Sequence, residues 1–308
     1  LLKPGCTSRH VSANGCAHAS ISNQSLSLAV AVFLTGAGFC RDGRNQHEKP
    51  SSGGRVDSMI IQIVAVTQRA LDPPPFKKPL ALAIRDPFSE PRIHRALPGG
   101  IYDLEVYRQE VVLGIHDHWI APEEGKWQYT YHERIEAYSL PDGRVINQLD
   151  YVIDALAQAP HTRRAQISIW KCWEDAGIHD PACLQRMWFR VFNDRLVMSC
   201  HMRSNDAFKA SYMNMYAFTE LQRLVAERLS ERLGREIAVG QYNHMVDSYH
   251  IYGSYFEEME AFLRTLEVRS WEERTWTMAQ IQPLIEEARE RIKQQLESER
   301  SLETGSDE

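Results

Sequence analysis

One stretch of the chain gathers side chains that suit nucleophilic attack on a phosphorylated substrate. Cys183 supplies a thiol, Arg203-Ser204 suits an anion, and Asp206 and Asn214 add a carboxylate and a carboxamide. Thiolate is a strong nucleophile near neutral pH, and a guanidinium binds phosphate oxygens in pairs. The alternatives are a buried, inert cysteine at Cys183 and a simple ion pair between Arg203 and Asp206.

A β-hairpin and a long helix are expected to position these groups. Hydrophobic residues alternate with other residues over 187–192 and again over 196–202, and Asn193-Asp194 between them is typical of a turn. Apolar residues recur at helical spacing over 211–233, and Gly234 suits the residue that follows a helix. The hairpin therefore leads directly into a buried helix.

The same periodicities predict further elements on both sides of the hairpin. Helices are expected at 101–114, 145–158 and 270–300, and strands at 59–66, 80–84, 165–171 and 237–252. The last helix is highly charged, and residues 301–308 are expected to fray.

The composition is that of a globular protein with a substantial core. Of the 308 residues, 43% are hydrophobic and 25% are charged. The formal net charge is −6, so no overall basic field points to DNA or RNA. The six cysteines contain no C-x-x-C pair, which argues against a zinc ribbon or a thioredoxin motif. Cys172 and Cys200 fall inside expected strands and are interpreted as core residues.

Residues 1–58 differ from the rest of the chain. They are rich in Ser, Gly, Asn and Cys, show little periodicity, and precede the first methionine, Met59. They are interpreted as a disordered extension or as upstream sequence, with one catalytic domain over 59–308. The apolar run at 26–40 is too short and too broken by glycine to span a membrane, so a cytoplasmic protein without a membrane partner is expected.

The His116-Asp117-His118 run invites comparison with a metal site. No third ligand lies at a diagnostic spacing, so a hydrogen-bonded polar loop is the favoured interpretation and no metal is expected.

Residues 129–255 resemble the core of thymidylate synthases and the related pyrimidine nucleotide hydroxymethylases. The motifs that carry the resemblance are a double arginine before a strand (Arg163-Arg164), a Pro-x-Cys loop (Pro181 to Cys183), an R-S-x-D motif (Arg203 to Asp206), Asn214, and the pair His250-x-Tyr252. Three departures are visible. Leu184 replaces the family's histidine after the nucleophile, the residues before His250 differ from the usual pattern, and no short folate-closing tail is recognisable.

The resemblance implies an α/β (α+β) fold of three layers, in which a mixed sheet is flanked by helices and its back packs against a second subunit. It also implies residue roles. Cys183 is the nucleophile, Asn214 binds the base and Asp206 binds the folate pterin. Tyr131 lines the pocket, and Glu110, with Glu105 as second choice, is the general acid/base. The phosphate is held by Arg203 and Ser204 together with the arginines that cross from the partner of a homodimer, Arg163 and Arg164, and the sugar 3′-hydroxyl by His250 and Tyr252.

The implied reaction is one-carbon transfer from methylenetetrahydrofolate to carbon 5 of a pyrimidine nucleoside monophosphate. An amide at Asn214 suits uracil, because it donates to O4 and accepts from the ring N–H, so methylation of dUMP to dTMP is the favoured reaction. A CMP or dCMP 5-hydroxymethylase is the first alternative. A nucleotide- or RNA-binding homologue without catalysis is the second.

Overall fold

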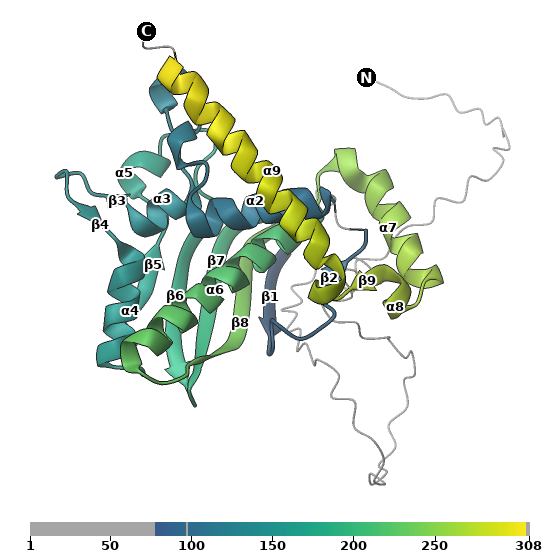
Figure 1. Ribbon diagram of the computed structural model, residues 1–308, viewed down its shortest axis with the longest axis horizontal. Helices are drawn as coiled ribbons and strands as arrows, with labels where there is room; N and C mark the ends of the chain where they lie inside the picture. Colours follow the sequence, from purple (N-terminus) through teal and green to yellow (C-terminus); the bar gives the residue numbers. More distant parts are fainter. Residues whose placement is uncertain (1–77, 97, 306–308) are drawn as a thin grey trace, which may run out of the picture.

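The computed structural model describes residues 78–96 and 98–305. The N-terminal extension and the strand expected at 59–66 lie outside the described residues. A five-stranded sheet stands at the centre, in the order β1-β8-β7-β6-β5 (Figure 1). Its strands are β1 Lys78–Ile84, β5 Gln166–Ser168, β6 Leu184–Phe192, β7 Arg195–Asp206 and β8 Ala238–His250. Only β7 and β8 pair in parallel within this sheet, so the expected mixed sheet is confirmed.

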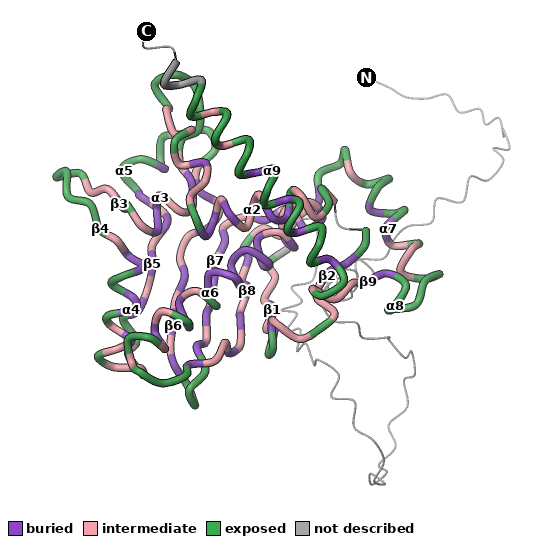
Figure 2. Tube along the Cα trace, viewed as in Figure 1, coloured by how far each residue is buried: buried purple, intermediate pink, exposed green. Residues whose placement is uncertain are grey.

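The predicted hairpin is confirmed as β6 and β7. Asn193 and Asp194 both have positive φ, at 50° and 54°, which is the backbone of a turn whose twist matches a β-hairpin. Buried and half-buried residues alternate along both strands, as Figure 2 shows in purple and pink. The apolar face of the hairpin therefore lies against the core, as the sequence pattern predicts.

Helices cover that face in successive layers (Figure 1). Helices α4 (Gln148–Gln158) and α6 (Ser211–Leu233) pack on the sheet and on each other, α2 (Gly100–Leu113) packs on α6, and α9 (Met278–Gly305) packs on α2. The predicted helix at 211–233 is confirmed, and Gly234 follows it with φ of 64°. No helix within the described ranges is long and apolar enough to cross a bilayer.

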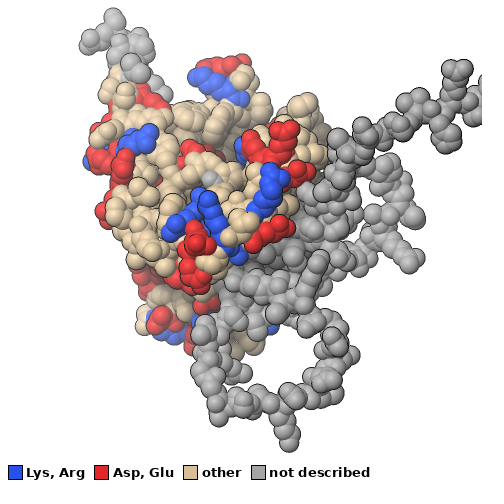
Figure 3. Space-filling view, turned by 90° about the vertical axis from the view of Figure 1, so that its right-hand side faces the viewer, with Lys and Arg blue, Asp and Glu red and all other residues tan. Residues whose placement is uncertain are grey.

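Short elements complete the fold. They are β2 Ile93–His94 paired with β9 Thr275–Trp276, β3 Tyr138–Ser139 paired with β4 Val145–Ile146, α3 Tyr131–Glu136, α5 Cys172–Asp175, α7 Phe256–Val268, α8 Trp271–Arg274, and the 3-10 turns η1 Asp117–Trp119, η2 Pro122–Glu124 and η3 Gly253–Tyr255. On the face turned to the viewer in Figure 3, described Lys or Arg and Asp or Glu side chains are interspersed, so this face carries no uniform charge.

Several boundaries differ from the prediction. The helix expected at 145–158 starts only at Gln148, because residues 145–146 form an exposed strand and Asn147 caps the helix by accepting from Asp150 N. The strand expected at 165–171 is limited to β5, and the one expected at 237–252 ends at His250. The helix expected at 270–300 is interrupted by β9, and α9 then continues to Gly305, into the stretch expected to fray.

The interpretation of Cys172 as a core residue is wrong. The chain leaves the sheet before this residue, which is exposed at the start of α5. Cys200 is buried in β7, as predicted.

Candidate active site

Several of the predicted site residues meet at one end of the central sheet. Because β7 and β8 run in parallel, their carboxyl ends share an edge, and the register places Asp206 beside His250. Cys183 immediately precedes β6 on this edge, and its carbonyl accepts a hydrogen bond of 2.8 Å from Arg203 N. The thiol, the Arg-Ser pair and the histidine are thus carried by three adjacent strands.

Arg203 holds the loop that carries Cys183. Its Nε donates to Ala182 O at 3.0 Å, its Nη2 donates to Pro181 O, and the Asp180 carboxylate lies 3.8 Å away. Burial raises the pKa of the half-buried Cys183 thiol, Arg203 lowers it and Asp180 raises it, with a net upward shift. Arg203 favours the thiolate of Cys183, but burial of the thiol has the larger effect on its pKa.

Three tyrosines lie near Cys183. The Tyr131 hydroxyl accepts a hydrogen bond of 3.2 Å from Leu184 N, which ties α3 to the first residue of β6. Burial raises the pKa of Tyr107, Tyr129 and Tyr131, and the nearby Cys183 charge adds to this increase in each case. Tyr131 therefore lies where it was expected, near Cys183, and Tyr107 is an additional neighbour.

Of the two glutamates considered for proton transfer, Glu110 is the better placed. Its carboxylate lies 3.0 Å from His116 Nδ1, and burial raises its pKa despite the opposing effect of His116. It also acts electrostatically on Tyr107, which neighbours Cys183. Burial raises the pKa of Glu105, but its hydrogen bonds from Arg108 and Arg289 lower it by more, so Glu105 is held as an ionised structural group.

Asn214 is buried in the first turns of α6, and its amide is bonded at both ends. Its Oδ1 accepts from the Tyr107 hydroxyl at 2.5 Å, and its Nδ2 donates to Asn205 Oδ1 at 3.1 Å. Nδ2 also lies 3.9 Å from the Met202 sulfur, and Oδ1 keeps capacity for one further hydrogen bond.

Asp206, His250 and Tyr252 lie at the ends of β7 and β8. One carboxylate oxygen of Asp206 accepts from Phe208 N at 2.9 Å. The rings of His250 and Tyr252 form a T-shaped contact with centroids 4.9 Å apart. Tyr252 lies two residues past the end of β8 and is 55% exposed, so only His250 of this pair belongs to the strand.

Arg163 and Arg164 are exposed in the segment before β5. Their backbone carbonyls accept hydrogen bonds from Trp188 Nε1 and the Tyr151 hydroxyl. Within the described residues neither guanidinium forms an ion pair, and neither contributes to the pKa shift of Cys183. Within one chain, these two arginines therefore do not belong to the cluster of side chains around Cys183.

The His116-Asp117-His118 run forms a hydrogen-bonded loop, as favoured. His116 bonds Glu110, Asp117 bonds His132 and Thr130, and His118 bonds Glu299. The described part of the chain contains no group of three or more His, Cys, Asp or Glu side chains suited to a metal ion.

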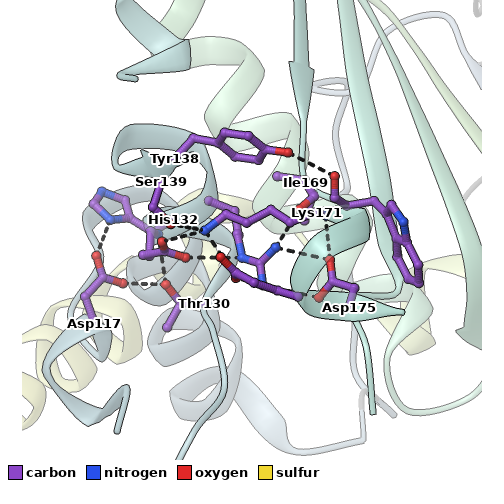
Figure 4. A network of polar contacts seen from close by, with 12 residues as sticks. Asp117, Thr130, His132, Tyr138, Ser139, Ile169, Lys171 and Asp175 are labelled. Atoms are coloured by element: carbon purple, nitrogen blue, oxygen red, sulfur yellow. Dashed lines mark hydrogen bonds and ion pairs between the residues drawn. The ribbon is translucent and has the colours of Figure 1, made fainter. Parts of the chain in front are cut away.

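A largely buried ionic network joins α3 to α5 (Figure 4). Arg134 of α3 forms a two-pronged pair with Asp175 of α5, at 3.1 and 3.2 Å, and donates to Ile169 O at 3.1 Å. Lys171, also buried, donates to Ser139 Oγ at 2.7 Å and lies 3.3 Å from Glu133. These contacts fasten α3, which carries Tyr131, to the segment that leads to Cys183.

A second part of this network depends on a glycine. Asp117 lies 2.6 Å from His132 Nδ1, and although burial lowers the pKa of His132, Asp117 raises it by more. Gly114 has φ of 65°, and a Cβ there would overlap His132 and lie 2.6 Å from Asp117 Oδ2. Gly234 has nearly the same φ, but a Cβ there would meet no atom within 4 Å.

We expect Gly114→Ala to destabilise the protein more than Gly234→Ala. Each variant places alanine in the left-handed region, which costs about 1–2 kcal/mol. Gly114→Ala also displaces the Asp117–His132 pair, which adds at least about 1 kcal/mol. Urea unfolding of both variants measures the difference, and equal losses of free energy of unfolding would contradict it.

The sequence patterns did not indicate Tyr107 and Asn205 as parts of the site. Tyr107 lies within the helix expected at 101–114 and stands three residues before Glu110, therefore on the same side of α2, and this spacing is the signal that could have found it. Asn205 stands at the unspecified position of the R-S-x-D motif, so no local signal distinguishes it.

A sequence model described as thymidylate synthase matches residues 103–296, which is more than half of the chain. The chain therefore belongs to the thymidylate synthase family, whose chemistry is folate-dependent one-carbon transfer to a pyrimidine nucleotide, with methylenetetrahydrofolate as donor. Among curated proteins it is similar to one from Methanocaldococcus jannaschii named "Putative thymidylate synthase". The two are 28% identical over 166 residues, which cover 52% of this chain and 68% of that protein.

Proposed function

We propose that this protein methylates carbon 5 of dUMP to give dTMP. The observation that carries the proposal is the cluster at the sheet end, where Cys183 lies beside Arg203 and Tyr107 is near both Cys183 and the buried amide of Asn214. Arg203 suits a phosphate group, Cys183 suits a pyrimidine carbon 6, and Asn214 suits the edge of a base. These are three parts of one nucleotide.

The first step is addition of the Cys183 thiolate to carbon 6, which forms an S–C6 bond and moves an electron pair toward carbon 5 and O4. The second N–H of Asn214, which makes only a 3.9 Å contact with the Met202 sulfur, stabilises the charge that develops on O4. Arg203 and Ser204 hold the phosphate and so fix the distance between sulfur and carbon 6. After transfer, a base removes the carbon 5 proton and the bond between the methylene group and the folate breaks. Tetrahydrofolate would then supply the hydride that reduces the methylene group to methyl, which leaves dihydrofolate, as the S–C6 bond breaks to return the thiolate.

Glu110 suits the proton transfers. Its raised pKa brings it closer to neutrality than an ordinary carboxyl group, which favours exchange of a proton in both directions. Tyr107, on which Glu110 acts electrostatically, donates the 2.5 Å hydrogen bond to Asn214. Glu110 and Asn214 are therefore connected through Tyr107.

The residues at Asp206 fit a folate. Oδ1 of Asp206 is occupied by backbone N–H groups of residues 208 and 209, whereas Oδ2 has no hydrogen-bond partner among the described residues. A carboxylate oxygen of this kind suits the amino and ring N–H donors of a pterin. Bound there, methylenetetrahydrofolate supplies the one-carbon unit.

A homodimer formed through the back of the sheet is part of the proposal. Side chains on that face, such as Trp188, Val197 and Met245, are only half-buried, and Arg190 Nε is buried without a hydrogen-bond partner within the described residues. A second copy would cover this face. In that arrangement the partner's Arg163 and the partner's Arg164 reach the phosphate.

Mixing two inactive variants tests this arrangement. A Cys183→Ser chain and an Arg163→Ala/Arg164→Ala chain are each expected to be inactive. After the two are unfolded together and refolded, heterodimers contain one intact site, so up to about a quarter of the natural activity returns. No recovery, with heterodimers demonstrated by affinity tags, would show that the arginines do not cross.

Release of tritium from carbon 5 tests the reaction itself. Labelled dUMP, UMP, dCMP and CMP are each incubated with methylenetetrahydrofolate. Release from dUMP with formation of dihydrofolate is the expected result. Release from a cytosine nucleotide with tetrahydrofolate as product would identify a hydroxymethylase instead. Release from none of the four, with nucleotide binding retained, would favour the non-catalytic homologue.

A further inference from the structure

A chain of buried polar side chains continues from Asn214 into the core. Asn214 Nδ2 donates to Asn205 Oδ1 at 3.1 Å, and Asn205 Nδ2 lies 3.0 Å from His244 Nε2. The other ring nitrogen of His244 lies 2.7 Å from the Tyr242 hydroxyl. His244 and Tyr242 are fully buried neighbours on β8, and Asn205 is 3% exposed on β7. None of these three residues has a role in the proposed reaction.

Met202 shows which way this chain of hydrogen bonds runs. Its thioether sulfur accepts hydrogen bonds and donates none, and it lies 3.3 Å from Asn205 Nδ2. The amide nitrogen of Asn205 therefore faces Met202 and His244, and its oxygen faces Asn214. Only the nitrogen of Asn214 can satisfy that oxygen, so Oδ1 of Asn214 is the atom turned toward Tyr107.

His244 fixes the direction of the remaining hydrogen bonds in this chain. Because Asn205 Nδ2 can only donate, His244 Nε2 must accept, so the ring proton sits on Nδ1 and faces the Tyr242 hydroxyl. A charged His244 would present N–H groups on both sides. Burial lowers the pKa of His244 to about 3, which keeps the ring neutral at physiological pH.

We propose that Asn205 and His244 set the base selectivity of this enzyme by holding the Asn214 carboxamide in one orientation. Both act as positioning residues, since they bond the amide or its neighbour and lie beneath it in the core. The proposal rests on the proposed function, because it concerns how the same site distinguishes pyrimidines.

The orientation matters because uracil and cytosine present opposite patterns. At position 4 uracil has an acceptor oxygen and cytosine has a donor amino group, and at ring nitrogen 3 the roles are again exchanged. An amide that is free to turn over matches either base, whereas an amide fixed by Asn205 matches one. A site whose buried groups pair with only one of two ligands rejects the other by about 10⁴-fold.

Two substitutions at Asn205 separate its effect on the orientation of the Asn214 carboxamide from its effect on core packing. Asn205→Leu has a similar size but removes the acceptor that faces Asn214 Nδ2. Asn205→Asp keeps an oxygen at that position whether or not the carboxyl group is ionised. The measurement is the ratio of kcat/KM for uracil and cytosine nucleotides of the same sugar, with each variant in the full chain.

We expect the ratio for Asn205→Leu to fall at least about 10-fold below that of the natural protein, and the ratio for Asn205→Asp to stay within about threefold of it. Parallel loss of activity toward both bases, with the ratio unchanged in folded Asn205→Leu, would overturn the proposal. A natural protein that turns over neither base would instead overturn the proposed function.

The tautomer of His244 provides a second measurement that needs neither activity nor a folded variant. Nitrogen-15 NMR of the natural protein distinguishes Nδ1–H from Nε2–H. The Nδ1–H form supports the assigned direction. The Nε2–H form reverses the chain of hydrogen bonds and overturns the proposal.

Discussion

Replacing Cys183 with serine is expected to abolish release of tritium from carbon 5 of dUMP, by at least about 10⁴-fold in kcat. A serine hydroxyl at this position has no partner placed to remove its proton, whereas a thiol reaches its reactive ionised form near neutral pH. The loss should appear in kcat with little change in dUMP affinity, because Arg203 and Ser204 remain. Single-turnover tritium release and equilibrium dUMP binding measure the two effects.

Cys172→Ser is the matched control, because Cys172 is a free thiol exposed at the start of α5. It is expected to retain full activity. Tritium release by Cys183→Ser at even a tenth of the natural rate would exclude Cys183 as the nucleophile.

The same experiment has a pH dependence whose sign follows from the structure. The pKa of Cys183 is raised, first by burial and then by Asp180, against the opposing effect of Arg203. A raised thiol pKa leaves less thiolate at neutral pH, so the rate of tritium release should increase as the pH rises through the pKa of Cys183. A rate that falls over that range would contradict this assignment.

Replacing Arg134 with methionine is expected to lower the free energy of unfolding by about 3–5 kcal/mol. The Arg134 side chain is 2% exposed and that of Asp175 is fully buried, so the variant leaves a buried carboxylate without its main charged partner. Urea unfolding measures the loss. Because the pair fastens the segment before Cys183, kcat is also expected to fall.

Arg144→Met is the matched control. Arg144 pairs with Asp142 at 2.8 Å, but both side chains are more than half exposed, so its loss should change stability by no more than about 1 kcal/mol. The double variant Arg134→Met/Asp175→Leu should recover part of the lost stability, because it removes the orphaned charge as well. A double variant less stable than Arg134→Met would show that the unpaired carboxylate is not the cause.

Local patterns were enough to predict the elements that carry the chemistry. The alternation over 187–202 and the turn residues Asn193-Asp194 predict β6 and β7, because side chains of a strand alternate between core and solvent over two residues. Short elements escaped prediction. The strand at 145–146 pairs with residues 138–139, so its extended form comes from that pairing, whereas its own apolar residues continue the helical spacing of α4.

By itself the sequence determined the nucleophile, the phosphate-binding pair and the base-binding amide as candidates, since each lies in a short motif of fixed spacing. Only the tertiary structure decided what surrounds them. Tyr107 meets Asn214 across 107 residues, and Asn205 meets His244 across 39, and such contacts arise from the packing of α2 on α6 and of β7 on β8. The direction in which the pKa of Cys183 shifts was likewise decided by burial, a property of the packed core that no run of residues specifies.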